Sequence, residues 1–414
     1  MNKIFSLLIG MMISSAAIAQ TNTLEKKLDD LSARLIKNES VTGINVLVIK
    51  DGKTAYNKAF GYADIDTKRP MRTDDIFRVA SQTKAITSVA VMMLWEEGYL
   101  LLDDPISKYI PAFKNPKVLA TYQAADTSFT TVPANREITI RDLFRHTSGL
   151  SYPFFSSDPR FNAIYAKSGT STGIGSKGLL KERIDLLAQQ PLVHQPGEAF
   201  TYGLSTDVLG YLVEVVSGMP LDEFFRKRIF EPLEMKDTYF LLPQEKAGRL
   251  VAVVQKTDKG WTKINNAIYE GNPVEYPLIK DTYFSGGAGL STTTADYSQF
   301  LQMLLNGGTY KGKRLLSSRT IAMMTTNQLP EKTIAHGDPD TRFGLGFELV
   351  TPDNKFKHAE SVGTFFWGGA FNTQYWVDPA EKMIVLVYTQ EYLPADFWEL
   401  HIRYSDVIYS NLDK

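Results

Sequence analysis

The sequence predicts an α+β protein, in which one antiparallel sheet is assembled from segments at both ends of the chain. Strand-like alternation occurs early, at 43–61, and again late, at 343–389, whereas helical patterns dominate between them. The first and last helices should cover the sheet, leaving a cleft beside the inserted region. With 414 residues, 43% of them hydrophobic, the chain is long enough for roughly two domains. We assign residues 20–80 and 285–414 to a sheet domain and residues 81–284 to a mostly helical region.

Residues 1–19 have the pattern of a secretory signal peptide. Asn2-Lys3 precedes an apolar stretch, and Ala17-Ile18-Ala19 forms a small-x-small cleavage site before Gln20. We expect cleavage after Ala19, a periplasmic or secreted location in a bacterium, and no stable membrane insertion after cleavage. An uncleaved anchor is the alternative, but the apolar stretch is shorter than the ~20 residues that a spanning helix needs.

Composition excludes several classes of function. The sequence contains no cysteine, so it has neither disulfides nor a thiol nucleophile. A net charge of −1 gives no basic footprint for nucleic acid. The five histidines lack metal-ligand spacing, and we expect neither a metal nor a cofactor. No pattern in the sequence specifies an oligomeric state.

The early elements follow from local signals. Alternation through Ile44, Val46 and Val48, a turn at Asp51-Gly52 and renewed alternation predict a β-hairpin over 43–61. An apolar, helix-forming run follows from about residue 81 to Gly98. Short helices and loops are expected from Asp103, with a Gly- and Ser-rich loop at 168–178.

The later elements are predicted in the same way. Helical patterns cover 181–189 and 206–217, the second ending before Gly218. Strand-like alternation covers 343–350, 373–377 and 383–389, and an amphipathic helix spans about 395–412. The strands therefore lie at the two ends of the chain.

The tetrad Ser81-Gln82-Thr83-Lys84 is the only Ser-x-x-Lys in the chain. Residues three apart share one helix face, so the Lys84 ammonium can lie beside the Ser81 hydroxyl. That geometry activates a serine without a histidine, and the helix N-terminus favours negative charge nearby. The alternative is an ordinary N-cap serine with a solvated lysine, because so short a motif recurs by chance.

Further motifs follow the tetrad in a fixed order: Leu143-Phe144-Arg145-His146-Thr147-Ser148-Gly149-Leu150, Phe200-Thr201-Tyr202-Gly203-Leu204 and Gly286-Gly287-Ala288-Gly289-Leu290. In this order they resemble the serine β-lactamase-like hydrolases, which include class C β-lactamases, D-alanyl-D-alanine peptidases and family VIII carboxylesterases. The resemblance covers about residues 25–390. It implies a β-lactamase-like fold and a serine that attacks an acyl carbon.

The resemblance also implies roles for other residues. Tyr202 matches the tyrosine that shares proton transfer with the lysine; in such a pair the ammonium favours the phenolate. Trp367-Gly368-Gly369 stands where the family usually carries Lys-Thr-Gly, so the amides of Ser81 and Ala370 would form the oxyanion hole. A core tyrosine, and a buried tryptophan beside two packing glycines, are the structural alternatives.

Two departures from the lactamase pattern indicate the substrate. Leu204 replaces the asparagine that contacts an amide side chain, and Trp367 replaces the lysine that binds a carboxylate. Losing such a charge-assisted bond costs about 1.5–3 kcal/mol. Trp-Gly-Gly at this place resembles the family VIII esterases, with Trp367, Gly368, Gly369, Leu204 and Phe155 as expected substrate contacts.

The sequence thus predicts an exported, cofactor-free serine hydrolase of short- to medium-chain esters, with Ser81, Lys84 and Tyr202 as its catalytic residues. Its expected partner is a small-molecule ester. A class C-like β-lactamase or D-alanyl-D-alanine peptidase is the first alternative. A non-catalytic peptidoglycan-binding envelope protein is the second.

Overall fold

The computed structural model describes residues 24–154, 156, 158–170, 173–268, 271–280, 283–331 and 333–412. The expected signal peptide and the candidate substrate residue Phe155 lie outside these ranges. Within them, no helix is both long enough and apolar enough to cross a membrane.

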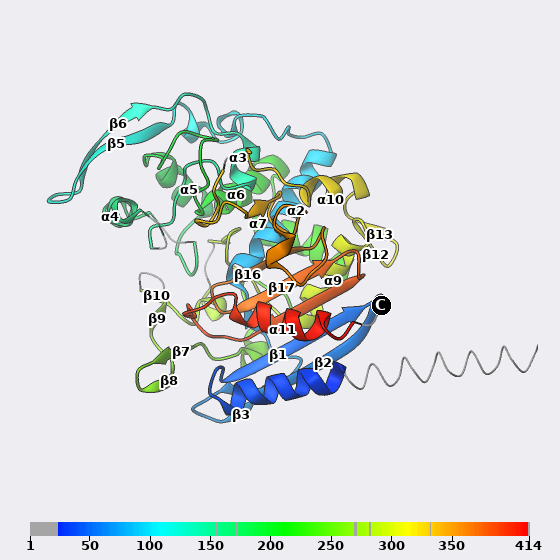
Figure 1. The fold of residues 1–414 in the computed structure, drawn as a ribbon. Helices are drawn as coiled ribbons and strands as arrows, with labels where there is room; N and C mark the ends of the chain where they lie inside the picture. The colour runs from blue at the N-terminus through cyan, green and yellow to red at the C-terminus, as the bar shows by residue number, and fades with distance from the viewer. Residues whose placement is uncertain are drawn as a thin grey trace, which may run out of the picture.

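An antiparallel sheet of eight strands forms the centre of the fold (Figure 1). Its order is β14-β15-β16-β17-β18-β1-β2-β3, so the C-terminal strands continue directly into the N-terminal ones through the β18–β1 pair. The predicted sheet from both ends of the chain is confirmed. Its strands are β1 (Gly43–Lys50), β2 (Lys53–Asp64), β3 (Arg69–Pro70), β14 (Arg342–Phe343), β15 (Glu348–Leu349), β16 (Phe365–Gly369), β17 (Thr373–Asp378) and β18 (Met383–Tyr388).

The β1–β2 hairpin shows how local sequence determines the sheet. Asp51 and Gly52 have φ of 50° and 72°, the positive values that a tight two-residue hairpin turn requires. Along β1, Val46 and Val48 pack on one face of the sheet and Leu47 on the other. The strand is therefore buried on both faces, and its register is firmly specified.

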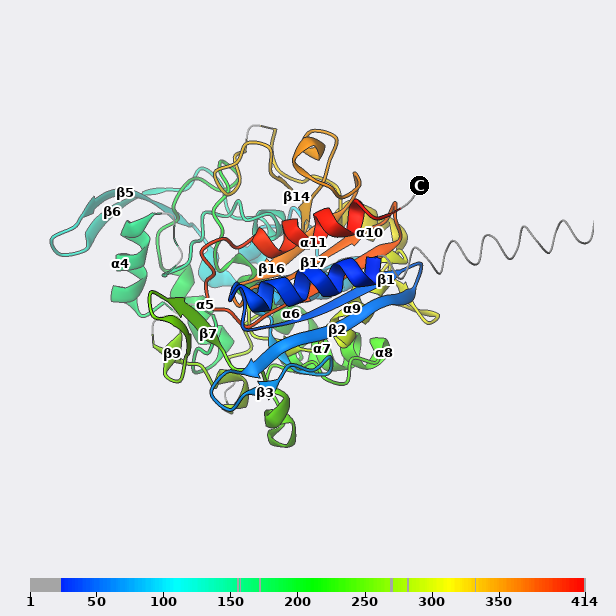
Figure 2. The same ribbon diagram turned by 60° about the horizontal axis from the view of Figure 1, so that its bottom comes forward.

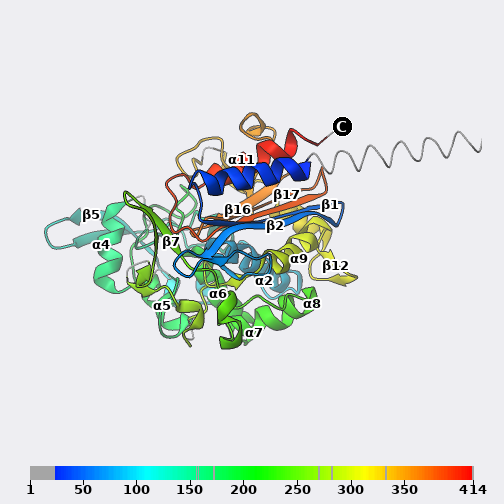
Figure 3. The same ribbon diagram turned by 90° about the horizontal axis from the view of Figure 1, so that it is seen from below.

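Two helices from opposite ends of the chain cover the outer face of the sheet. Helical residues 24–37 lie beside α11 (Glu399–Tyr409), as the views in Figures 2 and 3 agree. The two helices and the sheet enclose an apolar cluster that includes Leu31, Trp376 and Tyr404. The prediction that the first and last helices cover the sheet is confirmed.

The inner face of the sheet packs against α9 (Thr294–Leu305), and α2 (Thr83–Glu96) lies in the same main core. Residues 83–94 of α2 are all buried. On its other side α2 packs against α6 (Ser205–Ser217). A helix buried all round is a rigid support for side chains at its N-terminus.

The remaining elements surround this centre. The helices are α3 (Ile140–Phe144), α4 (Pro159–Ser168), α5 (Leu180–Ala188), α7 (Leu221–Phe225), α8 (Glu231–Leu233) and α10 (Ser318–Met324), with a π-helical turn at Arg226–Phe230. The short strands are β4 (Phe77–Arg78), β5 (Lys117–Gln123), β6 (Ser128–Pro133), β7 (Val254–Thr257), β8 (Gly260–Lys263), β9 (Ala267–Ile268), β10 (Asn272–Pro273), β11 (Ser291–Thr292), β12 (Thr309–Tyr310) and β13 (Lys313–Arg314).

Two predicted segments differ from the structure. The β5–β6 hairpin projects from the helical region, where only short helices and loops were expected (Figure 1). The single strand expected at 343–350 is split into β14 and β15 by a turn. The Gly344 amide closes this turn by donating to the Phe347 carbonyl oxygen at 2.8 Å. A Cβ on Gly344 would lie 2.1 Å from the Met324 carbonyl oxygen, so a residue with a side chain does not fit there against the end of α10.

Candidate active site

Ser81 lies in a short 3₁₀ turn, Ala80–Gln82, that leads into α2. Val79 joins β4 to this turn, and its amide donates to the Leu290 carbonyl oxygen at 3.1 Å. Ala80 is fully buried and has φ of 40°, a strained conformation for a residue with a side chain. This bend leaves Ser81 partly accessible while the helix behind it is buried.

The Lys84 ammonium is buried and surrounded by oxygen atoms. It donates to Ser81 Oγ at 3.1 Å, to the Tyr152 hydroxyl at 3.0 Å and to the Gly287 carbonyl at 2.7 Å. It also lies 4.8 Å from the centre of the Tyr202 ring. The structure thus brings together Ser81, Lys84 and Tyr202, but Tyr202 meets the ammonium with its ring rather than its hydroxyl.

Tyr152 is a site residue that the sequence did not reveal. Its ring centre lies 5.6 Å from that of Tyr202, so two phenols stand beside the same ammonium. The available signal was its position just after the motif ending at Gly149-Leu150. That motif fixes a loop; only the folded chain brings the loop to Lys84.

A buried carboxylate, Asp207 on α6, is a second residue that the sequence missed. Its Oδ1 accepts from Ser285 Oγ at 2.7 Å and from the Tyr283 hydroxyl at 3.3 Å. Burial raises the pKa of Asp207, while the positive charge of Lys84 acts to lower it. Gly287 fits between these charges: a Cβ there would lie 2.4 Å from Asp207 Oδ2 and 3.5 Å from Lys84 Nζ.

The Trp367-Gly368-Gly369 segment forms the end of β16, against the turn that carries Ser81. A Cβ on Gly369 would lie 2.1 Å from the Val79 carbonyl oxygen, and one on Gly368 would lie 2.7 Å from the Phe397 ring. Both glycines are needed for packing, which supports the structural alternative for them. This close approach also brings Ala370 to the wall that contains Ser81.

The amide of Ser81 is suited to binding an oxyanion. Ser81 is the second residue of its helical turn, and the first N–H groups of a helix have no partner inside it. Ala370 follows β16 directly and lines the same cavity. The two residues proposed for the oxyanion hole therefore share one cavity wall.

A cavity of about 540 Å³ opens over Ser81. Five of its fifteen lining residues are tyrosine, tryptophan or phenylalanine, and the described lining residues include no lysine and no arginine. The residues are Ser81, Tyr152, Ile174, Tyr202, Ala288, His336, Asp338, Thr341, Glu348, Trp367, Gly368, Ala370, Leu393, Phe397 and Trp398.

Of the expected substrate contacts, Trp367 and Gly368 line this cavity. Leu204 does not: it is 2% exposed and belongs to the main core, where it precedes α6. Gly369 packs against Val79 and is also absent from the lining.

Aromatic packing fixes the orientation of Tyr202. The ring of buried His146 lies 4.7 Å from it and that of Trp367 lies 5.7 Å away. Burial lowers the pKa of His146 well below its usual value, so the imidazole is neutral at physiological pH. His146 therefore supports the tyrosine as an uncharged ring.

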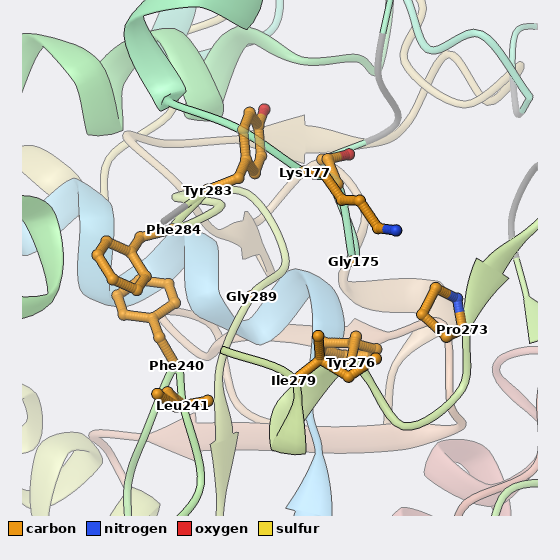
Figure 4. Close-up of a pocket in the computed structure, with 12 residues that line it drawn as sticks. Gly175, Lys177, Phe240, Leu241, Pro273, Tyr276, Ile279, Tyr283, Phe284 and Gly289 are labelled. Carbon is orange, nitrogen blue, oxygen red and sulfur yellow. The ribbon is translucent and has the colours of Figure 1, made fainter. Parts of the chain in front are cut away.

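A second depression is lined by Gly175, Lys177, Tyr276 and neighbouring residues (Figure 4), and its described lining does not include Ser81. Phe240 and Phe284 pack together at one end of it, with ring centres 5.3 Å apart. Its volume is about 40 Å³, room for only a few water molecules. The chemistry therefore belongs to the larger cavity over Ser81.

This fold and site define a serine hydrolase of the β-lactamase type. The chain belongs to the beta-lactamase family, whose model matches residues 24–407. EstCE1, described as a hydrolase with promiscuous acyltransferase activity, has a similar structure: the TM-score is 0.80 at 27% identity, over 95% of this chain and all of that one.

Curated relatives match over more than three quarters of their own length. Protein Rv1367c of Mycobacterium tuberculosis is 35% identical over 359 residues, 84% of this chain and 86% of that protein. Esterase EstB of Burkholderia gladioli is 28% identical over 412 residues, 94% and 96% of the two chains. A putative D-alanyl-D-alanine carboxypeptidase of Escherichia coli K12 is 28% identical over 380 residues, 83% and 77% of the two chains.

Proposed function

We propose that this protein is an exported serine esterase that cleaves neutral carboxylic esters of short to medium acyl length through an acyl-serine intermediate. The observation that carries the proposal is the 3.1 Å contact between Lys84 Nζ and Ser81 Oγ beside an aromatic cavity of about 540 Å³. The relationship to esterase EstB supports an ester substrate. Export rests on the signal pattern of residues 1–19, and N-terminal sequencing of the mature protein tests it.

In the first half of the reaction, Ser81 Oγ attacks the ester carbonyl carbon. Its proton passes to the base formed by Lys84 and Tyr202, and the amides of Ser81 and Ala370 stabilise the oxyanion. The oxyanion then collapses, the bond to the alcohol oxygen breaks, and that oxygen takes the proton. In the second half, the same base takes a proton from the water that attacks the acyl-serine. The bond from the acyl carbon to Ser81 Oγ then breaks, Ser81 Oγ takes that proton, and the acid is released. The Tyr202 hydroxyl reaches hydrogen-bond geometry once substrate is bound, as is common for catalytic contacts.

The charge of the cavity favours esters over β-lactams and D-alanyl peptides, which carry a carboxylate. Among the described lining residues the formally charged ones are the acidic Asp338 and Glu348. A substrate carboxylate would meet no cation among the described residues of that lining. A β-lactamase or D,D-peptidase would use the same chemistry at Ser81. It would also need a cation to bind the substrate carboxylate, and the described lining residues include none.

The test is a substrate panel under one buffer condition, with purified protein and the Ser81→Ala variant. We expect hydrolysis of p-nitrophenyl butyrate with kcat/KM well above that for nitrocefin or a D-Ala-D-Ala peptide. Ser81→Ala should lose roughly a thousandfold or more of the activity. A preference for nitrocefin would overturn the esterase proposal, and wild-type activity in Ser81→Ala would overturn the site.

A further inference from the structure

Glu348 on β15 lines the catalytic cavity. In the sequence it is far from Ser81, Lys84 and Tyr202. It also lines an adjoining cavity of about 260 Å³. It is partly buried, and within the described residues its carboxylate has no hydrogen bond and no ion pair.

The acidic residues near Glu348 differ from it because they form ion pairs with a lysine. Asp338 accepts from the Lys357 ammonium at 2.8 and 2.9 Å, and Asp340 lies 2.7 Å from the same nitrogen. Lys357 is thereby occupied by two carboxylates. Glu348 is left as the carboxylate of the cavity without a counter-charge among the described residues.

Aromatic rings form much of the remaining wall. Trp398 lies 6.3 Å from Trp367 and 4.8 Å from Phe397, measured between ring centres, and Trp367 lies 5.7 Å from Tyr202. All four residues line the cavity together with Glu348. Aromatic faces attract organic cations, including quaternary ammonium groups that cannot donate a hydrogen bond.

We propose that the preferred substrates are esters that carry an organic cation, an ammonium or quaternary ammonium group, which Glu348 and the aromatic wall bind while Ser81 attacks the ester carbonyl. This inference rests on the proposed esterase function and specifies its substrate class. A cation bound there supplies the counter-charge that Glu348 lacks. The cation makes no covalent bond, so the reaction stays an ester hydrolysis.

The affinity of the cavity for a cation should depend on pH. Burial and the nearby negative charge of Asp338 raise the pKa of Glu348 to about 8. The empty site is therefore mostly protonated at pH 7 and loses its proton when a cation binds. Affinity for a permanent cation should rise with pH, at most tenfold per pH unit, and level off above pH 8.

The titratable groups around Glu348 include Asp338, Lys357 and His336. Ion pairing with Lys357 lowers the pKa of Asp338 and raises that of Lys357, so both stay charged between pH 6 and 9. Burial of its ring lowers the pKa of His336 to about 4, although the residue as a whole is exposed, so the imidazole is neutral in that range. The remaining groups in the adjoining cavity are Asp340, His358 and His401.

Matched ester pairs test the proposal. Butyrylcholine is compared with 3,3-dimethylbutyl butyrate, its uncharged carbon isostere, which varies the alcohol side. The p-nitrophenyl esters of 4-(trimethylammonio)butyrate and 5,5-dimethylhexanoate vary the acyl side. We expect kcat/KM to favour the cation by about tenfold or more in at least one pair at pH 8. Equal or better hydrolysis of the neutral ester in both pairs overturns the inference but leaves the esterase proposal intact. Absence of hydrolysis of all four contradicts the esterase proposal itself.

Variants assign the preference to Glu348. In Glu348→Gln the ratio of the two kcat/KM values should fall to about one, and using the ratio cancels any general loss of activity. Asp353→Asn is the control, because it removes an exposed carboxylate that pairs with Arg342 and does not line the cavity. If Glu348→Gln keeps the preference, or Asp353→Asn loses it equally, the assignment is wrong.

A binding measurement is independent of turnover of the cationic esters. Tetramethylammonium should competitively inhibit hydrolysis of p-nitrophenyl butyrate, with an inhibition constant that falls from pH 6 to pH 8. Glu348→Gln should remove this dependence. Inhibition that is absent or independent of pH in the wild type would contradict the role of Glu348.

Discussion

The Lys84 ammonium has three oxygen partners at once: the nucleophile, a phenol and a backbone carbonyl. These contacts fix its position beside Ser81 before substrate arrives. Two phenols, Tyr152 and Tyr202, share this ammonium but meet it differently, one through its hydroxyl and the other through its ring. At the scale of single residues, their roles are therefore separable.

Phenylalanine substitutions distinguish the two tyrosines. Tyr202→Phe should lower kcat for p-nitrophenyl butyrate by about 10²–10⁴, because it removes the proposed proton relay. Tyr152→Phe should cost about tenfold, because it removes one of three bonds that orient Lys84. Steady-state kinetics, with melting temperatures as a control for folding, measure both. Wild-type kcat in Tyr202→Phe would contradict the relay.

A glycine substitution tests the oxyanion wall. In Gly369→Ala the added Cβ would lie 2.1 Å from the Val79 carbonyl oxygen, so the backbone before Ser81 must move away from β16. We expect kcat to fall about 10²-fold, since misplacement near 1 Å has that cost. Gly248→Ala is the matched control, because nothing lies within 4 Å of its added Cβ. Unchanged kcat in Gly369→Ala would show that the contact between β16 and the backbone before Ser81 does not position the oxyanion hole.

At the scale of elements, α3 holds the loop that presents Tyr152. Thr139 and Asp142 form a capping box at its start. The Asp142 carboxylate also accepts from Arg136, Arg145 and Thr147, joining the helix to the chain on both sides of it. These bonds outweigh its burial and lower the pKa of Asp142 to about 2.

This low pKa gives a stability profile in acid. The folded pKa of Asp142 lies below the unfolded value of about 3.9, so its contribution is fully present above pH 4 and is lost as the pH falls towards 2. The shift corresponds to about 2–3 kcal/mol. In Asp142→Asn the free energy of unfolding should be lower at pH 7 and should fall less between pH 4 and 2. Urea unfolding at several pH values measures this, and parallel profiles for the two proteins would contradict it.

Sequence patterns predicted the elements whose signals are local. The Asp51-Gly52 turn, α5, α6 and the last helix were all predicted near their observed positions, because turn chemistry and periodicity act over a few residues. The break at Gly344 was not, because it depends on a carbonyl of α10 about twenty residues away in the chain. The β5–β6 hairpin was likewise missed, since its strands lack clear alternation and are largely exposed.

The same distinction applies to the site. Ser81 and Lys84 are one helical turn apart, so their contact follows from spacing alone. Tyr152, Asp207 and Glu348 lie in three separate segments, and only tertiary packing brings them around that turn. Leu204 was assigned to the substrate by its place in a motif, but its side chain is part of the core.

At the scale of the whole molecule, the two ends of the chain close the fold together. Tyr404 of α11 is fully buried, and its hydroxyl lies 2.8 Å from Ser32 Oγ in the helix of residues 24–37. Both helices share one apolar cluster with the outer face of the sheet. The nucleophile lies on the other side of that sheet.

Tyr404→Ala should therefore lower the free energy of unfolding by about 3–5 kcal/mol, the usual cost of a large cavity in a core. Its kcat below the melting transition should stay close to the wild-type value, because the cavity forms on the outer face. Ile402→Ala, on the same helix but 54% exposed, should change stability little. A similar small change in Tyr404→Ala would mean that the outer helices do not stabilise the sheet.

Covalent labelling shows whether Ser81 is an activated nucleophile. Wild-type protein, Ser81→Ala and Ser148→Ala are each treated with a fluorophosphonate and examined by intact and peptide mass spectrometry. Ser148 is the control because it is fully buried and bonds to Ser205 Oγ at 2.8 Å. We expect a single adduct on Ser81 in the wild type and in Ser148→Ala, and none in Ser81→Ala. No adduct on folded wild-type protein, or equal labelling of Ser81→Ala, would contradict it.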